Sequence, residues 1–88
     1  MTVVKLHKNF RKQAALLKPA QQKRLQAALK LFQQEPMHPE LYNHPLTGQW
    51  AGYRSIAFGG DWRAHFELTD NGTIAWFVTC GTHAQLYR

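Results

Sequence analysis

The sequence predicts an α+β protein: an N-terminal strand, a helical hairpin and then a three-stranded antiparallel meander, with the helices packed on one face of the sheet. Three observations support this prediction. Apolar residues recur at helical spacing before residue 36, they alternate at strand spacing after residue 52, and turn-forming sequences separate the later segments. A chain of 88 residues can bury one modest core, so we expect residues 1–88 to form a single domain.

The first 35 residues are predicted to form a short strand and two helices. Residues 3–6, which include two valines and a leucine, suit the strand. Pro19 separates the helices, because proline is favoured in the first turn of a helix, and Glu35-Pro36 ends the second one. The apolar stripes expected to face the core are Phe10, Ala14 and Leu17 in the first helix and Leu25, Ala28, Leu29 and Phe32 in the second.

Residues 36–50 are predicted to form a long loop with at most a short helical turn. The segment has no sustained apolar periodicity, and its turn-forming residues are Pro36, Pro39, Pro45 and Gly48. Loops of this length in compact domains are usually functional, so we expect this one to contribute to a site.

Three antiparallel strands are predicted after the loop, at residues 52–58, 62–68 and 73–80. They are joined by Gly59-Gly60-Asp61 and by Asp70-Asn71-Gly72, of which the second is typical of a β-hairpin. The middle strand alternates between apolar and polar residues, which predicts one buried and one polar face. We expect a functional site on that polar face, which carries Arg63, His65 and Glu67.

The strand at 52–58 fits this pattern less well. Placing Arg54 on the open, polar face of the sheet also places Ile56 and Phe58 there. A β-bulge in this strand would resolve the conflict.

The charge is unevenly distributed. The net charge is +6, and residues 1–34 hold eight of the eleven lysines and arginines and no acidic residue. Helix stability does not explain this, because acidic residues favour the first turn of a helix and pair well with lysines one turn away. A phosphate backbone or an acidic protein segment would fit such a surface, and solvated helix faces are the alternative.

Several classes of protein are not expected. Cys80 is the only cysteine, which excludes an internal disulfide, and no cluster of histidines and cysteines has zinc-ligand spacing. The N-terminal apolar run is too short for a signal peptide, and no run of about 18 apolar residues suggests a membrane span. We therefore expect a cytoplasmic protein without a metal or other cofactor and without membrane association.

The remaining polar residues suit metal-independent RNA cleavage. This reaction needs a base for the 2′-hydroxyl proton and an acid for the departing 5′-oxygen, and histidine suits both roles near neutral pH. His44, held extended by Pro45, and His83, at the end of the last strand, are the candidates. Either could equally be a surface histidine. Asp61 could orient an imidazole, although an aspartate after two glycines also suits a tight turn.

Other residues are candidates for binding the RNA. Arg54 and Arg63 could grip a phosphate with two hydrogen bonds each, against the alternative of paired or solvated strand arginines. Tyr87 and Trp62 could stack on bases, although strand parity places Trp62 on the apolar face. For His65 the sequence indicates no partner, only the same face as Arg63.

Three motifs occur together in this chain: Asn43-His44-Pro45-Leu46-Thr47-Gly48-Gln49-Trp50-Ala51-Gly52-Tyr53-Arg54, then Asp61-Trp62, then Gly81-Thr82-His83 with Leu86-Tyr87. With the order of strand, helical hairpin and three strands, they make nearly the whole chain resemble the YafQ branch of the RelE/ParE toxin superfamily. The resemblance implies a ribosome-dependent mRNA endonuclease, the toxin of a type II toxin-antitoxin pair. Its partners would be the ribosome, mRNA and a cognate antitoxin, which could wrap the basic helices.

The resemblance also implies roles for single residues. His44, Asp61 and His83 match the family's proton-transfer residues, and Tyr87 matches an aromatic residue needed for activity. Arg63 lies where RelE proper carries its phosphate-stabilising arginine, and Arg54 aligns with a RelE lysine.

Two positions depart from the YafQ pattern: Ala57 replaces a histidine and Thr79 replaces an arginine. Two other interpretations therefore stay open. One is a ParE-like inhibitor that binds DNA gyrase, against which the set of histidines argues. The other is a catalytically weakened interaction module of the same fold, which the two departures favour.

Overall fold

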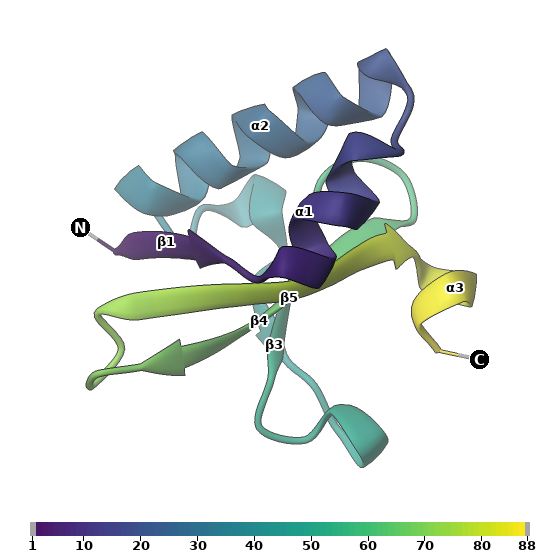
Figure 1. Ribbon diagram of the computed structural model, residues 1–88. Coiled ribbons are helices and arrows are strands. Elements are labelled where there is room, and N and C mark those ends of the chain that lie inside the picture. The colour runs from purple at the N-terminus through teal and green to yellow at the C-terminus, as the bar shows by residue number, and fades with distance from the viewer. Residues whose placement is uncertain (1, 88) are drawn as a thin grey trace.

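The computed structural model describes residues 2–87, which form a five-stranded mixed sheet in the order β1-β5-β4-β3-β2 (Figure 1). The strands are β1 (Val3–Leu6), β2 (His44–Pro45), β3 (Arg54–Ala57), β4 (Trp62–Thr69) and β5 (Ile74–Thr82). β1 pairs with β5 in parallel, and every other neighbouring pair is antiparallel. The predicted α+β class and order of elements are confirmed.

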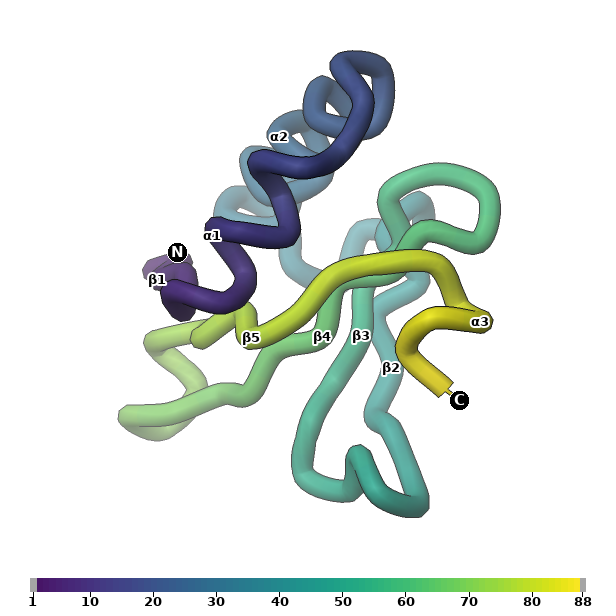
Figure 2. Tube along the Cα trace, turned by 45° about the vertical axis from the view of Figure 1, so that its right-hand side comes forward, coloured from purple at the N-terminus to yellow at the C-terminus, as the bar shows by residue number. Residues whose placement is uncertain are grey.

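Two helices cover one face of the sheet. Figures 1 and 2 show α1 (Lys8–Ala15) and α2 (Pro19–Gln34) on the same side, whereas the loop between β2 and β3 extends to the other side. That loop contains the short 3-10 helix η2 (Gly48–Trp50), and the four-residue helix α3 (His83–Leu86) follows β5 at the far end of the sheet. We call the side of the sheet opposite α1 and α2 the open face.

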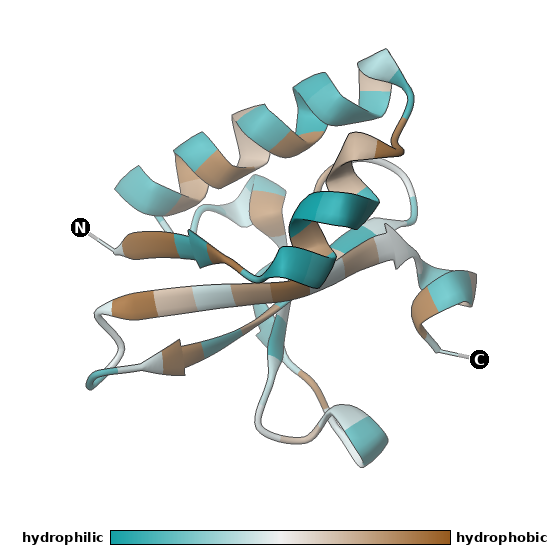
Figure 3. Ribbon diagram, viewed as in Figure 1, coloured by the Kyte–Doolittle hydropathy of each residue, from teal (hydrophilic) through white to brown (hydrophobic). Residues whose placement is uncertain are grey.

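The core lies between the helices and the sheet and is rich in aromatic side chains. Phe77 packs against three other rings, with centroids 5.7 Å from Phe10, 5.4 Å from Phe32 and 4.9 Å from Phe66. All four are at most 1% exposed. Burying such a side chain contributes about 1.5 to 3 kcal/mol relative to leaving it in water. Figure 3 shows the hydrophobic residues that recur along both helices and supply this layer.

A β-bulge in β5 shifts the strand's alternation. His65 pairs with Thr79 and the next residue, Phe66, pairs with Phe77, so Val78 has no partner in the register with β4. The extra residue puts Thr79 opposite His65 in the register, although its hydroxyl turns to Oε1 of Gln13 in α1. A bulge in the strand at 52–58, suggested above to resolve its pattern, is not found: Arg54–Ala57 pair with β4 without a register shift, and the bulge lies in β5.

Arg54 lies on the helix-covered face. Its cross-strand partner is Phe66, and paired residues direct their side chains to the same face. The prediction that Arg54 lies on the open face is wrong, because Ile56 and Phe58 must be buried in the core and strand alternation carries Arg54 with them. Its Nε donates a hydrogen bond to Oδ1 of Asn43 at 2.8 Å.

The loop predicted at 36–50 contains more structure than expected. It holds the 3-10 helix η1 (Pro39–Leu41), the two-residue strand β2 and η2. A strand of two residues has no detectable alternation, so only its pairing with β3 reveals it. Among residues 2–87, every helix is too short or too polar to cross a membrane.

Candidate active site

Cross-strand pairing builds a row of polar side chains on the open face. His44 pairs with Ser55, Ser55 with His65, and His65 with Thr79, so one residue from each of β2, β3, β4 and β5 lies in line. Paired side chains point to the same face, so His44, Ser55 and His65 share the open face, whereas the Thr79 hydroxyl donates to Gln13 of α1. The register thus places His44 on the same face as His65, although 20 residues separate them in the sequence.

His65 is the centre of this row. Its side chain is 0% exposed, and its Nε2 lies 3.2 Å from the hydroxyl of Tyr87. The ring of Trp50 packs against it edge-on, with centroids 4.6 Å apart and planes at 79°. The prediction that His65 has no partner is wrong. The only signal in the sequence was that it shares a strand face with Arg63.

The surroundings of His65 keep its imidazole neutral. Burial lowers its pKa from 6.5 to about 4, and the positive charges of His44 and His83 act in the same direction. Near neutral pH the ring is therefore uncharged, and one of its nitrogens can accept a hydrogen bond. The same effect indicates that His44 and His83 lie close enough to His65 to interact with it through charge.

The helix α3 brings His83 and Tyr87 to the row. It begins with a capping box: the Thr82 N–H donates to Oε1 of Gln85 at 2.8 Å, and the Gln85 N–H donates to Oγ1 of Thr82 at 3.3 Å. Gly81 leaves space for this turn, because a Cβ there would lie 2.8 Å from Oε1 of Gln85. One turn of helix then stacks the rings of His83 and Tyr87, with centroids 4.4 Å apart.

Two backbone carbonyls hold α3 against the rest of the molecule. The His83 N–H donates to the carbonyl of Asp61 at 2.9 Å, and Nε1 of Trp50 donates to the carbonyl of Leu86 at 3.2 Å. The Asp61 side chain is exposed, so its clearest structural contribution is this carbonyl. The same Trp50 ring packs on His65, which links η2, α3 and β4 around the row.

Arg63 places a cation beside Tyr87. It belongs to the next row of the open face, with Ala57 and Gly81 as its cross-strand neighbours. Its Nη1 donates to the carbonyls of Gly60 and Trp62 at 2.8 and 2.9 Å, which fixes the guanidinium. Burial raises the pKa of Tyr87, and the nearby charge of Arg63 opposes that rise.

His44 is held by the residue two positions before it. It lies in β2 and not in a loop as predicted, and its Nδ1 is 2.8 Å from the carbonyl of Tyr42. A carbonyl can only accept, so Nδ1 carries the hydrogen and, in the neutral ring, the lone pair lies on Nε2. The ring of Tyr42 packs alongside at 4.6 Å. His44 thus offers Nε2 as the nitrogen that can take up a proton.

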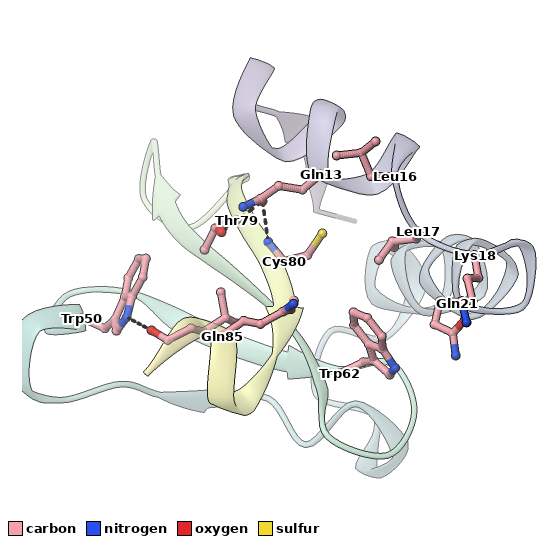
Figure 4. Close-up of a pocket in the computed structure, with 12 residues that line it drawn as sticks. Gln13, Leu16, Leu17, Lys18, Gln21, Trp50, Trp62, Thr79, Cys80 and Gln85 are labelled. Atoms are coloured by element: carbon pink, nitrogen blue, oxygen red, sulfur yellow. Dashed lines mark hydrogen bonds between the residues drawn. The ribbon is translucent and has the colours of Figure 1, made fainter. Parts of the chain in front are cut away.

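Trp62 lies apart from this cluster. It packs against the core on the helix-covered side and lines a groove of about 710 Å³ between the helical hairpin, β5 and α3. Figure 4 shows its indole beside Leu17 and Gln21, on the opposite side of β5 from Trp50. In the same groove, Oε1 of Gln13 accepts hydrogen bonds from the Thr79 hydroxyl and the Cys80 N–H, which ties α1 to β5.

The arrangement brings together most of the predicted site residues and separates two. His44, His83 and Tyr87 lie around His65 on or beside the open face, Arg63 lies near Tyr87, and the Asp61 carbonyl supports His83. Arg54 and Trp62 lie on the helix-covered face. The half-buried His44 and the exposed His83 can transfer protons, and the hydrogen-bonded guanidinium of Arg63 can stabilise negative charge. Together they are suited to general acid–base chemistry on an anionic substrate.

Comparisons of sequence and structure with known proteins all find YafQ toxins. The family described as the bacterial toxin of a type II toxin-antitoxin system, YafQ, matches residues 2–88. The mRNA interferase toxin YafQ of Escherichia coli K12 is 42% identical over 50 residues, 56% of this chain and 52% of that protein. In this comparison the chain spans about half the length of the curated relatives it matches.

Solved structures resemble the whole chain. The crystal structure of YafQ from E. coli BL21(DE3) matches with a TM-score of 0.80 and 25% identity over 100% of both chains. The E. coli DinJ-YafQ toxin-antitoxin complex matches with a TM-score of 0.78 and 26% identity, covering 99% of this chain and 98% of that chain. A YoeB/ParE toxin from Agrobacterium tumefaciens, at 15% identity and a TM-score of 0.76, shares the fold.

Proposed function

This chain belongs to the YafQ family of bacterial type II toxins, and from that membership we propose that it is an endoribonuclease, an mRNA interferase, acting as a single-domain toxin. Its relatives in E. coli are named mRNA interferase toxin. The observation that supports the same activity here is the gathering of His44, His83 and Arg63 around one part of the open face. These are the residue types that metal-independent cleavage of RNA requires.

The proposed reaction is an attack by the 2′-hydroxyl on the adjacent phosphorus. A base removes the hydroxyl proton, the new P–O bond forms a cyclic phosphate, and an acid protonates the departing 5′-oxygen as its bond breaks. His44 and His83 share these two proton transfers. Arg63 stabilises the negative charge on the phosphate oxygens, and Asp61 orients or assists His83 through its position next to it in space.

The two separated candidates receive other roles. Arg54 holds Asn43 by a hydrogen bond, and Nδ2 of Asn43 donates to the carbonyl of Pro36 at 2.9 Å. We therefore assign Arg54 to positioning the segment that precedes His44. The Trp62 ring packs against the core and lies 5.9 Å from the ring of Phe58, so Tyr87, whose ring lies beside His83, is the preferred stacking residue.

We also propose three partners: a cognate antitoxin, the ribosome and mRNA. A solved relative of this chain is the E. coli DinJ-YafQ toxin-antitoxin complex. The uncompensated lysines and arginines of residues 1–34 lie mostly on exposed helix positions, where they can meet ribosomal RNA or an acidic antitoxin segment. Binding to the ribosome is therefore expected to weaken steeply as salt is raised.

The test is to map the 5′ ends of mRNA after induction of the wild-type chain in a bacterial host. In-frame cuts in translated messages, accompanied by growth arrest, would support the nuclease. A DNA-damage response without such cuts would favour gyrase inhibition instead. Neither arrest nor cleavage would leave only an interaction module of this fold. His7→Ala is the control, because His7 is exposed and packs against Trp76, away from the row.

A further inference from the structure

We propose that His65 is a positioning residue of this site, which accepts the hydroxyl hydrogen of Tyr87 and so fixes the aromatic ring beside His83. The proposal rests on the nuclease function above. It concerns a residue that neither the motifs of the family resemblance nor the comparisons assign.

Burial of His65 is not explained by stability. Its strand neighbours Ala64 and Phe66 are also 0% exposed and are apolar, so the strand readily provides buried apolar positions. A buried polar side chain is costly unless its atoms form hydrogen bonds. Within residues 2–87, Nδ1 of His65 is buried and has no hydrogen-bond partner. A histidine kept here at that cost points to a role for the one nitrogen that does have a partner.

That partner is the hydroxyl of Tyr87. The oxygen lies 3.2 Å from Nε2, and the two rings are 5.4 Å apart at 61°. Trp50 packs edge-on against the same imidazole and so limits its rotation. The contact therefore joins a side chain fixed in the sheet to one that follows a four-residue helix.

Tyr87 needs such a contact, because little else orders it. Its N–H donates to the carbonyl of His83 at 3.1 Å, and its ring packs against the His83 ring. A helix as short as α3 is marginal without tertiary contacts. The bonds from the His83 N–H to Asp61 and from Trp50 to Leu86 hold the backbone of α3, and neither of them involves the Tyr87 side chain. The bond to His65 is thus a direct link from the Tyr87 hydroxyl to the sheet.

The charges around His65 determine the direction of this hydrogen bond. The groups that face it are His44 from β2, His83 from α3 and the hydroxyl of Tyr87 after α3, with Arg63 near that hydroxyl. Its cross-strand neighbours Ser55 in β3 and Thr79 in β5 are uncharged. No acidic side chain is among these groups to stabilise an imidazolium. His65 is therefore neutral at pH 7, and its unprotonated Nε2 accepts the O–H of Tyr87.

The remaining hydrogen of His65 then lies on Nδ1, which shares its row with Ser55. Among residues 2–87, Oγ of Ser55 is the other buried side-chain atom without a partner. The two residues are direct cross-strand neighbours on the same face. The row therefore holds two buried polar atoms, Nδ1 of His65 and Oγ of Ser55, that form no hydrogen bond among residues 2–87.

The first test is NMR of the full-length chain, made by cell-free synthesis with ¹⁵N-labelled histidine. At pH 7 we expect Nε2 of His65 to show the chemical shift of an unprotonated, hydrogen-bonded nitrogen. Tyr87→Phe, which removes only the hydroxyl, should change that shift and leave the signals of His7 unchanged. The proposal would be overturned if Nε2 is protonated, or if its chemical shift is the same in Tyr87→Phe as in the wild type, whether or not the chain cleaves RNA.

The second test is a double-mutant cycle in the cleavage of mRNA on translating ribosomes. His65→Leu and Tyr87→Phe are each expected to slow cleavage about tenfold at saturating ribosomes with half-saturation unchanged, and the double variant should be no slower than either. His65→Gln, whose amide oxygen can accept the same hydroxyl hydrogen, should restore most of the rate. A double variant slower than both single variants would show that His65 acts independently of Tyr87 and would refute the positioning role.

These outcomes separate the two proposals. A wild-type chain that cleaves no message would overturn the nuclease function, while NMR still decides the contact between His65 and Tyr87. If His65→Leu fails to fold, Tyr87→Phe and His65→Gln carry the comparison, since neither removes a buried side chain without replacement. Thermal unfolding of each variant separates a loss of rate from a loss of folded protein.

Discussion

Phe66 and His65 are neighbours in β4, both 0% exposed, and they face opposite sides of the sheet. Phe66 meets the rings of Phe32 and Phe77 under the helices. His65 contacts Trp50 and Tyr87 on the open face, and its buried Nδ1 has no hydrogen-bond partner among residues 2–87. The two residues are equally buried but act differently. Phe66 stabilises the core, whereas His65 orders polar groups on the open face at a cost in stability from its Nδ1, which is unpaired among residues 2–87.

The two faces are also covered differently. The helix-covered face is closed by α1 and α2, whose apolar stripes pack on the sheet. In the part of the chain that the structure describes, η2 and α3 lie beside the histidine row on the open face, and hydrogen bonds from Trp50 to Leu86 and from His83 to Asp61 hold α3 there. Elements with few apolar contacts open at a lower free energy than the core. Changes on the two faces should accordingly separate stability from activity.

Among the substitutions that distinguish the two faces, Phe77→Ala on the helix-covered face is expected to have the largest effect on stability. Removing the ring that contacts Phe10, Phe32 and Phe66 leaves a cavity and should lower the free energy of unfolding by about 3 to 5 kcal/mol. Urea unfolding followed by circular dichroism measures it. Leu16→Ala is the matched control, because Leu16 is 86% exposed and its loss should change stability by less than about 0.5 kcal/mol.

On the open face, His83→Ala should do the reverse. We expect cleavage to fall about 100-fold or more, because a proton-transfer group is lost. The free energy of unfolding should change by less than about 0.5 kcal/mol, since His83 is exposed. Single-turnover cleavage on ribosomes and urea unfolding measure the two quantities. Undiminished cleavage would remove His83 from the mechanism, and a large loss of stability would show that the two faces are not separable.

The free energy of unfolding is also expected to depend on pH because of His65 on the open face. The pKa of His65 falls from 6.5 to about 4 on folding, so between these values the unfolded chain binds a proton that the folded chain does not. Stability is full above pH 6.5 and should fall as the pH drops toward 4, by about 1 kcal/mol per pH unit. His65→Gln should show a shallower dependence than the wild type when unfolding is followed from pH 7 to pH 4. Parallel curves would contradict a buried neutral imidazole.

The smallest effect is expected from Thr82→Ala, which removes half of the capping box of α3. Loss of this N-cap should cost about 1 kcal/mol, confined to α3, and should lower activity several-fold by loosening His83 and Tyr87. Hydrogen exchange of the α3 amides and the cleavage rate measure the two effects. Thr73→Ala is the control: its hydroxyl donates to Asp70 in the hairpin at the other end of β5, so its loss should not affect cleavage.

Much of the helix-covered face could be predicted from local sequence. The spacing of Phe10 and Phe32 within their apolar stripes predicted helical faces, and both residues are in the core. The hairpin signal at Asp70-Asn71-Gly72 is confirmed, with all three residues at positive φ. These features follow from contacts and backbone preferences within one element, which short sequence patterns encode directly.

The candidate site could be predicted only in part. The motifs pointed to His44, His83, Arg63 and Tyr87, which gather on or beside the open face. His65 could not be predicted as a site residue, because the alternation of its strand does not indicate that Trp50 and Tyr87 will cover it. The predicted face of Arg54 is wrong because Ile56 and Phe58 are buried in the core and strand alternation places Arg54 on their side of the sheet.

The elements, the apolar faces of the two helices, the basic character of residues 1–34 and the family could all be predicted from the amino-acid sequence. Periodicity, turn chemistry and charge act over a few neighbouring residues, so they can be read along the chain. The proximity of His44, His65, His83 and Tyr87 follows from the tertiary structure. Their meeting depends on the register across four strands, on one extra residue in β5 and on the docking of a four-residue helix. Register is fixed by the burial of the whole sheet, so no local pattern contains it.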